Sequence, residues 1–261
     1  MTSQAPPATA APTGEAPPLR VTIRPGVTFP DWTAVSSANT KAALNAIFEA
    51  FGAARCWDSY SAEDDRVRRA VFEGYARDGR APGTGALAEA TGLEPARVRE
   101  LLTGLKSRDL VVLDESGSEV TGAYPLTNRE TGHRVGLPGQ SVNAMCAIDA
   151  LGAGGMFGED TTVESACRAC GAGIGVRTEG GGRVLAEASP DTALVWSGIE
   201  YEDGCAATSL CTVIAFFCSD QCLESWRAAE HPDTEGYRLS MDEALQAGLA
   251  IFGPMLTPAT E

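Results

Sequence analysis

Cys146 and Asp149 stand three positions apart in the apolar run NAMCAIDALG, residues 143–152. If this run is helical, residues i and i+3 project from one face about one turn apart. A carboxylate beside a thiol can take its proton and activate the thiolate, and the resulting acid can then hand the proton on. Burying an aspartate among apolar residues is costly unless it has a partner or a task. The short motif is equally compatible with a buried cysteine next to a helix-capping aspartate.

Four other cysteines have the spacing of a metal site. Cys167 and Cys170 form a CxxC pair in the Gly-rich segment CRACGAGIG, and Cys218 and Cys222 lie in FFCSDQCLESW, where a predicted strand meets a predicted helix. A knuckle pair and a strand-to-helix pair together supply the ligands of a tetrahedral all-cysteine zinc site. The second segment also resembles the second half of treble-clef modules. A closed four-thiolate site has no open position for a substrate, so we expect a structural Zn²⁺.

The remaining cysteines carry less information. Cys211 begins the apolar segment SLCTVIAFF, predicted as a strand, in which burial as a small apolar residue is the simplest role. Cys205 and Cys56 are assigned no role.

Seven of the eight cysteines follow residue 140, and the chain has only two histidines. Any metal site is therefore mainly sulfur-based, which favours soft metals.

The bulk composition excludes some classes of function. The 261 residues carry a formal net charge of −15, from 20 basic and 35 acidic residues. Nucleic acids and anionic membranes require basic surface, so both are disfavoured as partners. No apolar run approaches the roughly 20 residues that span a bilayer. The N-terminus lacks the features of a signal peptide. We therefore expect a cytoplasmic protein whose thiols stay reduced.

The chain divides into three predicted segments. Residues 1–18 are rich in Pro and Ala and are predicted to be disordered. Residues 19–123 are predicted to be mainly helical, and within them residues 62–123 read as three helices followed by a hairpin, the pattern of a winged helix. The third of these helices carries the basic residues that DNA binding would need, diluted by acidic neighbours. These basic residues are Arg97, Arg99, Lys106 and Arg108.

Residues 124–261 are predicted to form an α+β domain with a small mixed sheet. Strands are expected in TTVESAC, GRVLAEAS, TALVWSGIEY and CTVIAFFC. Helices are expected in DQCLESWRAAE and SMDEALQAGLAIFG. The fold class predicted for the whole chain is therefore α+β.

Several segments in this order resemble one family, the organomercurial (alkylmercury) lyases. PLTNRETGHRV resembles the segment just ahead of the family's active site, and NAMCAIDALG its active-site helix. ESACRACGAG is similar to the segment with the family's third, non-catalytic cysteine, which corresponds to Cys167. SLCTVIAFF is similar to the strand that bears the second essential cysteine. The resemblance extends over roughly residues 62–252 and includes an N-terminal winged-helix-like region.

The resemblance implies a mercury-detoxifying enzyme that confers mercury resistance. Cys146 and Cys211 would be the two mercury-binding cysteines, and Asp149 the proton shuttle. Thiolates bind soft mercury well, and Asp149 would accept a thiol proton and deliver it to the carbon, releasing a hydrocarbon. Hg²⁺ would stay bound as the product until low-molecular-weight thiols or a mercuric reductase remove it. No organic cofactor is required.

The sequence departs from the family in its additional cysteines, because Cys170, Cys218 and Cys222 have no counterpart in a typical member. Two alternatives therefore stay open. One is a protein that binds or carries another soft metal without catalysis, and the other is a metal-responsive regulator that binds DNA through the winged helix. Neither alternative requires Asp149.

Overall fold

The computed structural model describes residues 18–57 and 61–259, so the predicted disordered extension lies almost wholly outside the described residues. The α-helices are α1 (Ala38–Phe51), α2 (Ala53–Trp57), α3 (Ala62–Asp78), α4 (Thr84–Thr91), α5 (Pro95–Ser107), α6 (Ala147–Phe157), α7 (Asp220–Glu230) and α8 (Met241–Phe252). Short 3₁₀ turns are η1 (Trp32–Ala34), η2 (Ala206–Thr208), η3 (Leu210–Thr212) and η4 (Gly253–Met255). The strands are β1 (Val21–Arg24), β2 (Val27–Phe29), β3 (Val112–Leu113), β4 (Val120–Ala123), β5 (Leu126–Thr127), β6 (Arg134–Leu137), β7 (Gln140–Ala144), β8 (Thr162–Ala166), β9 (Gly173–Glu179), β10 (Val184–Ser189), β11 (Leu194–Gly198), β12 (Ile214–Phe217) and β13 (Gly236–Ser240).

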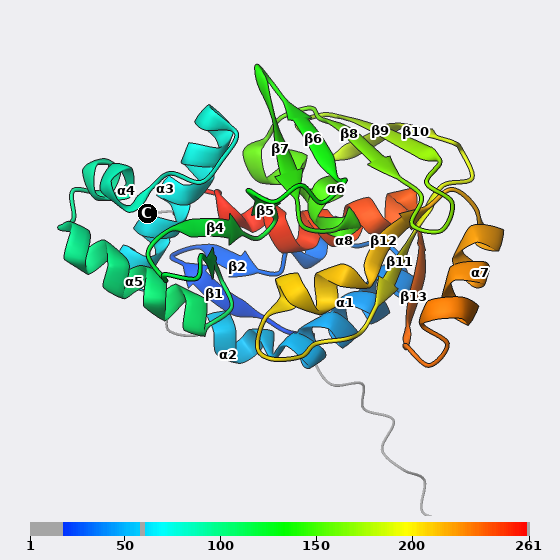
Figure 1. Ribbon diagram of the computed structural model, residues 1–261, viewed down its shortest axis with the longest axis horizontal. Helices are drawn as coiled ribbons and strands as arrows, with labels where there is room; N and C mark the ends of the chain where they lie inside the picture. The colour runs from blue at the N-terminus through cyan, green and yellow to red at the C-terminus, as the bar shows by residue number, and fades with distance from the viewer. Residues whose placement is uncertain (1–17, 58–60, 260–261) are drawn as a thin grey trace, which may run out of the picture.

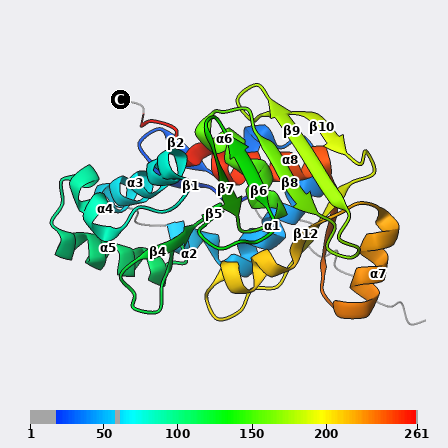
Figure 2. The same ribbon diagram turned by 45° about the horizontal axis from the view of Figure 1, so that its top comes forward.

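These strands form two sheets and a separate hairpin. The larger sheet has eight strands in the order β10-β9-β8-β6-β7-β5-β4-β3, and every neighbouring pair is antiparallel. The smaller sheet has the order β12-β11-β13, and β1 pairs with β2. Figure 2 shows β6, β8, β9 and β10 lying across α6 and α8. The predicted α+β class is confirmed, but the predicted small mixed sheet is wrong, because the larger sheet has eight strands and the described strands of both sheets pair only antiparallel.

Helices α6 and α8 cross at the centre of the molecule (Figure 1), and glycines let them approach closely. Almost the whole of α6 is buried, and its sequence AIDALGAGGMF is rich in small residues. A Cβ atom on Gly152 would lie 2.7 Å from the carbonyl oxygen of Gly248 on α8. The crossing therefore leaves no room for a methyl group, and it fixes the position of the helix that carries Asp149.

Helices α3, α4 and α5 pack together at one end of the molecule, and α7 lies at the other end (Figure 1). The expected order of three helices and a hairpin is present, although the β3–β4 hairpin is the edge of the eight-stranded sheet and continues into β5 and β7. Its classification as a winged helix stays a prediction. Of the basic residues of α5 and its C-cap, Arg97 forms ion pairs with Glu63 and Glu100, both at 2.7 Å, and Arg108 lies 3.7 Å from Asp64.

The large sheet has more strands than the sequence indicates. β6, β7 and β9 lie in the segments RVGL, QSVNA and GIGVRTE, in which glycine and polar residues weaken the apolar alternation of a strand. The sequence-based prediction for Cys211 is also wrong in one detail. The predicted strand begins only at Ile214, and Cys211 lies in the preceding 3₁₀ turn η3.

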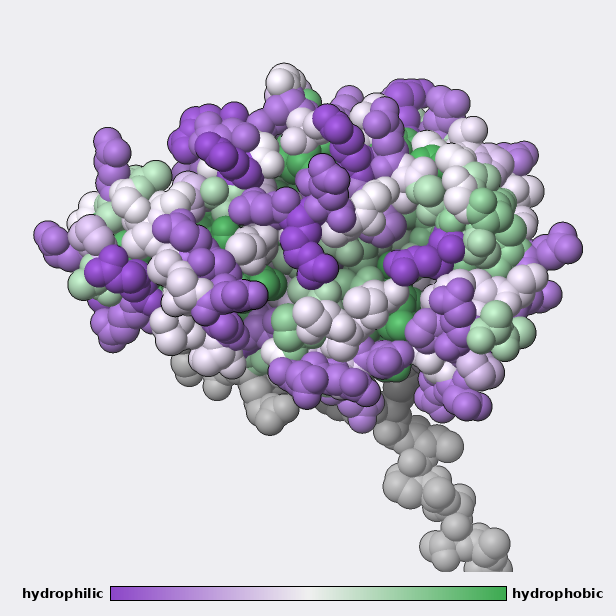
Figure 3. Space-filling view, viewed as in Figure 1, coloured by the Kyte–Doolittle hydropathy of each residue, from purple (hydrophilic) through white to green (hydrophobic). Residues whose placement is uncertain are grey.

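The outer surface is mainly polar. Hydrophilic residues surround the face in Figure 3, with residues of intermediate and apolar character between them in the centre and at the right. Among the described residues, Val184 is the large apolar side chain that is mostly exposed. No helix in the described part of the chain is long and apolar enough to cross a membrane.

The crossing of α6 and α8 predicts that Gly152→Ala is destabilising. The added methyl group would meet backbone of α8 and the ring of Phe252, so we expect the free energy of unfolding to fall by about 1–3 kcal/mol. Gly104→Ala is the matched control, because Gly104 is exposed on α5 with open space around it. There the alanine should stabilise the protein by about 0.5–1 kcal/mol. Urea unfolding measures both changes, and equal effects would contradict the close crossing.

Candidate active site

Cys146, Asp149 and Cys211 meet at one buried point. The two Sγ atoms and a carboxylate oxygen of Asp149 all lie within 4.8 Å of one another. Their exposed fractions are only 2%, 4% and 7%. The structure thus brings together the three residues that the sequence analysis singled out for chemistry.

The start of α6 orients this cluster. Cys146 is the N-cap residue of α6, and its Sγ accepts a hydrogen bond from the backbone N–H of Asp149 at 3.5 Å. Asp149 therefore lies in the first turn, where the helix dipole favours a negative charge. Cys211 approaches from η3, and its thiol donates to Oδ2 of Asp149 at 3.6 Å. A thiol and a carboxyl group are thus already in position to exchange a proton.

Burial sets the protonation of the cluster. Desolvation raises the pKa of Asp149 to about 7, although hydrogen bonds from both cysteines oppose the shift. Burial also raises the pKa of Cys146, and the hydrogen bond with Cys146 together with burial raises that of Cys211. Among the described residues no cationic side chain pairs with Asp149. At neutral pH both thiols are therefore protonated, while the carboxyl group is divided between its two forms.

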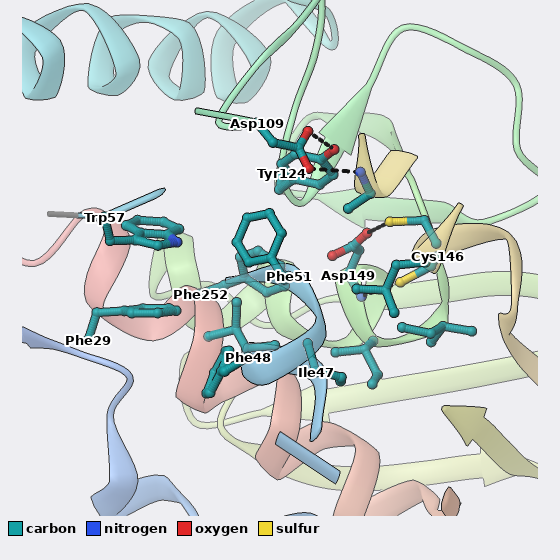
Figure 4. Close-up of a pocket in the computed structure, with 16 residues that line it drawn as sticks. Phe29, Ile47, Phe48, Phe51, Trp57, Asp109, Tyr124, Cys146, Asp149 and Phe252 are labelled. Atoms are coloured by element: carbon teal, nitrogen blue, oxygen red, sulfur yellow. Dashed lines mark hydrogen bonds between the residues drawn. The ribbon is translucent and has the colours of Figure 1, made fainter. Parts of the chain in front are cut away.

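An apolar cavity of about 80 Å³ opens beside the cluster. Figure 4 shows Cys146 and Asp149 at one end, with aromatic side chains from the N-terminal part of the chain at the other. Phe29 and Trp57 stack with ring centroids 4.4 Å apart. The other apolar lining residues are Ile47, Phe48, Phe51, Ile148, Ala206, Leu210, Ile214, Ile251 and Phe252. Residues from both sides of position 124 therefore build one pocket.

A second buried carboxyl group holds the loop that leads to Cys211. Asp109 accepts hydrogen bonds from Tyr124 Oη at 2.7 Å, from Tyr201 Oη at 3.2 Å and from the backbone N–H of Ala206 at 2.8 Å. Tyr124 Oη in turn accepts from the backbone N–H of Ala207 at 2.9 Å. Burial raises the pKa of Asp109, although the three hydrogen bonds oppose this. The network fixes the loop ahead of η3.

The sequence analysis missed this network. Its one local signal is the position of Asp109 just after the end of α5, where the backbone has a left-handed φ of 52°. Aspartate tolerates that conformation better than most residues, but it does so in many ordinary turns. The partners of Asp109 come from distant parts of the chain, so no spacing could identify them.

A polar groove of about 240 Å³ reaches Cys211 as well. Its lining residues are Val112, Thr127, Arg129, Glu130, Thr131, His133, Met145, Arg168, Ala207, Thr208, Cys211 and Thr212. His133 is buried, and its Nδ1 lies 2.9 Å from Ser165 Oγ. Burial, together with the nearby charge of Arg168, lowers the pKa of His133 to about 4, so this side chain is neutral at physiological pH.

The four cysteines of the predicted metal site also come together. The Sγ atoms of Cys167, Cys170, Cys218 and Cys222 all lie within 4.8 Å of one another. Cys167 and Cys170 stand in the tight turn between β8 and β9, and the other two flank the junction of β12 and α7. Burial raises the pKa of Cys167, but backbone hydrogen bonds outweigh it and lower that pKa to about 7. Cys56 and Cys205 belong to neither cysteine group.

The chain is similar to known proteins in both sequence and fold. The family model for alkylmercury lyase, MerB, matches residues 126–253. An alkylmercury lyase of Staphylococcus epidermidis is 29% identical over 162 residues, which are 62% of this chain and 70% of that protein. The chain is thus similar in sequence to the alkylmercury lyases. A solved structure, the mercury-bound form of MerB2, superposes with a TM-score of 0.67 at 25% identity, covering 83% of this chain and 100% of that one.

The alkylmercury lyase match covers both cysteine groups but not the whole pocket. Residues 126–253 include Cys146, Asp149 and Cys211, whereas Phe29 and Trp57 precede the match. The structural likeness to MerB2 extends over more of the chain than the family model does. The alkylmercury lyase fold is therefore shared beyond the matched segment.

The raised pKa of Asp149 predicts how stability depends on pH. This carboxyl group titrates near 7 in the folded chain and near 3.8 in the unfolded chain. Its contribution to the free energy of unfolding therefore falls as the pH rises from about 4 to about 7, and it is constant above that. Between about pH 5.5 and about pH 8, wild type should lose about 2 kcal/mol more than Asp149→Asn, as measured by urea unfolding.

The exposed residue Asp191 supplies the control for this measurement. Asp191→Asn should follow the wild-type pH dependence, since this side chain is on the surface. Parallel curves for wild type and Asp149→Asn would show that the carboxyl group titrates normally in the folded protein.

Proposed function

We propose that this chain cleaves the carbon–mercury bond of organomercurials by protonolysis, as an alkylmercury lyase, and releases a hydrocarbon and Hg²⁺. The observation that carries the proposal is the meeting of two buried thiols with a carboxyl group of raised pKa at the end of an apolar cavity. Mercury is soft and binds thiolates strongly, so Cys146 and Cys211 match the metal of the substrate.

The two cysteines would bind the metal in succession. One thiol displaces the weakly held ligand of the organomercury cation and releases its proton. The second thiol then gives its proton to the Asp149 carboxylate as its sulfur binds mercury. Cys211 is placed for this transfer, because its thiol already donates to Asp149. Two thiolates on one mercury raise the electron density on the attached carbon, which makes that carbon easier to protonate.

Asp149 would complete the reaction. Protonated by the second thiol, it delivers this proton to the carbon as the carbon–mercury bond breaks, and the hydrocarbon leaves. The overall change converts the organomercury cation and two thiols into a hydrocarbon, Hg²⁺ bound by the Cys146 and Cys211 thiolates, and one released proton. A carboxyl pKa of about 7 suits a group that must both take and give a proton near neutral pH.

The apolar cavity would hold the organic group. Its lining from Phe29, Phe48 and Trp57 offers apolar surface without competing ligands for mercury. Burying an alkyl or aryl group there contributes about 25 cal/mol per Å² of apolar surface removed from water. The organic group and the metal are thus drawn to opposite ends of one pocket, and the chemistry needs no organic cofactor.

This mechanism predicts that Asp149→Ala separates metal binding from cleavage. The variant should lose about 10²–10⁴-fold in the rate of benzene release from phenylmercury, because the proton donor is gone. It should still bind phenylmercury through Cys146 and Cys211. Gas chromatography of benzene and equilibrium dialysis of mercury measure the two properties.

Asp191→Ala is the control for removing an aspartate, since its side chain is exposed and outside the cavity. It should release benzene at the wild-type rate. Failure of the wild-type protein to release any hydrocarbon would refute the lyase proposal and leave a soft-metal carrier. The ion pairs of Arg97 with Glu63 and Glu100 reduce the basic surface that α5 would offer to DNA in a regulator.

We also propose that Cys167, Cys170, Cys218 and Cys222 bind a structural Zn²⁺. Their Sγ atoms are arranged around one point, with 3.7 Å between those of Cys170 and Cys218 and 3.5 Å between those of Cys218 and Cys222. The turn that carries the first pair is closed by backbone hydrogen bonds, from Cys167 to Ala172 and from Gly171 to Cys167. Four thiolates fill a tetrahedral zinc site, so this metal would stabilise the fold and take no part in cleavage.

The zinc proposal predicts that Cys218→Ser removes both metal and stability. Elemental analysis should find about one zinc per chain in wild type and little in the variant, whose thermal midpoint should fall by several degrees. Cys205→Ser is the matched control, because Cys205 lies outside both cysteine groups. Purified wild type that contains no zinc and four freely titrating thiols would contradict the proposal.

A further inference from the structure

Cys211 stands between two cavities of opposite character. It lines the apolar cavity together with Cys146 and Asp149, and it also lines the polar groove. Among the residues described for the two linings, Cys211 is the one they share. A molecule in the groove would therefore contact Cys211 without passing through the space that holds the organic group.

The groove has a charge opposite to that of the protein. Arg129 and Arg168 are exposed at its edge and Glu130 is the acidic residue of the lining, so two positive charges and one negative charge give a local charge of +1. The neutral His133 adds nothing to this sum. The whole chain carries −15. A local excess of arginine beside a buried thiol on so acidic a protein favours a small anion.

The other polar groups of the groove do not explain this charge. The hydroxyl groups of Thr127, Thr131, Thr208 and Thr212 donate to backbone carbonyl oxygens of Thr121, Ala144, Cys205 and Ser209. Their donors are therefore used within the protein. Among the side chains of the lining, the guanidinium groups of Arg129 and Arg168 are therefore the ones available to bind an anion. Each can bind a carboxylate through paired N–H donors.

We propose that the groove is the entry site for a small carboxylate-bearing thiol that removes Hg²⁺ from Cys211. The inference rests on the proposed function, in which mercury ends the reaction bound to Cys146 and Cys211. The carboxylate would pair with Arg129 or Arg168, and the thiol would point to the sulfur of Cys211. The volume of about 240 Å³ is suited to a molecule of a few heavy atoms.

The removal is a ligand exchange without oxidation or reduction. The thiolate of the incoming molecule forms a bond to mercury, and the mercury–sulfur bond of Cys211 breaks. The proton of the incoming thiol passes to the departing Cys211 thiolate, with Asp149 close enough to carry it. A second thiol displaces Cys146 in the same way. Two thiols and the mercury-bridged protein thus give one mercury dithiolate and two free cysteine thiols.

The test compares thiols of different charge on protein loaded directly with inorganic Hg²⁺, which makes it independent of carbon–mercury cleavage. Mercaptoacetate is anionic, 2-mercaptoethanol is neutral and cysteamine is cationic. Each is supplied at the same thiolate concentration, and mercury released from the protein is measured after rapid gel filtration. The mercury retained by a Cys146→Ser/Cys211→Ser reference is subtracted, because the four-cysteine group also binds mercury.

Wild type should release mercury to mercaptoacetate roughly fivefold faster than to 2-mercaptoethanol, with cysteamine slowest, and salt should reduce the difference. Arg129→Gln and Arg168→Gln should each lower this preference, and Glu130→Gln should raise it. Arg183→Gln is the matched control, because it removes an exposed arginine that lies outside the groove. It should leave the preference unchanged.

Two results would overturn the inference. One is equal release to the three thiols. The other is a preference that changes equally in Arg168→Gln and Arg183→Gln, which would point to the net charge of the protein. Rapid release to a cysteine-containing protein domain with none to small thiols would instead assign removal to a protein partner. Benzene release from phenylmercury, measured separately, reports on the proposed function alone.

Discussion

The burial of the Asp149 carboxyl group is the constraint on which the rest of the structure depends. A carboxylate removed from water without a cationic partner is unfavourable, and here the helix N-terminus and two thiols supply only part of the lost solvation. The balance leaves a group that takes and releases a proton near neutral pH. A lysine or arginine beside it would hold the carboxyl group ionised and remove its capacity to donate a proton to carbon.

The surrounding architecture maintains this dry environment. The glycine-lined crossing of α6 and α8 fixes the first turn of α6, and the Asp109 network fixes the loop that brings Cys211 to Asp149. The aromatic residues of β2, α1 and α2 close the far end of the cavity. Segments that are distant in the sequence therefore surround the Asp149 carboxyl group. Each of them either keeps water from this group or fixes the position of the residues around it.

Local chemistry was readable from the sequence, and tertiary packing was not. The cysteine spacings predicted the four-cysteine group, because ligand pairs are short motifs. The grouping of Cys146 with Cys211 came from the resemblance to the lyase family. The helices of clear periodicity, such as α7 and α8, were predicted in place. The sequence did not indicate that Phe29 and Trp57 line the pocket, because the sequence around an aromatic residue is similar whether it lines a cavity or packs in the core. Arg129 and Arg168 are ordinary surface arginines until the fold places them beside one thiol.

The position of strand β12, between two cysteines of different groups, determines which thiols could bind the same metal ion. Cys211 precedes this strand and Cys218 follows it, and all four of its residues are buried. An extended strand of four residues spans about 13 Å, so one ion cannot be shared by thiols at its two ends. The chain thus has two sulfur compartments joined by a rigid spacer. Mercury held by Cys146 and Cys211 would therefore be bound apart from a Zn²⁺ held by the four-cysteine group.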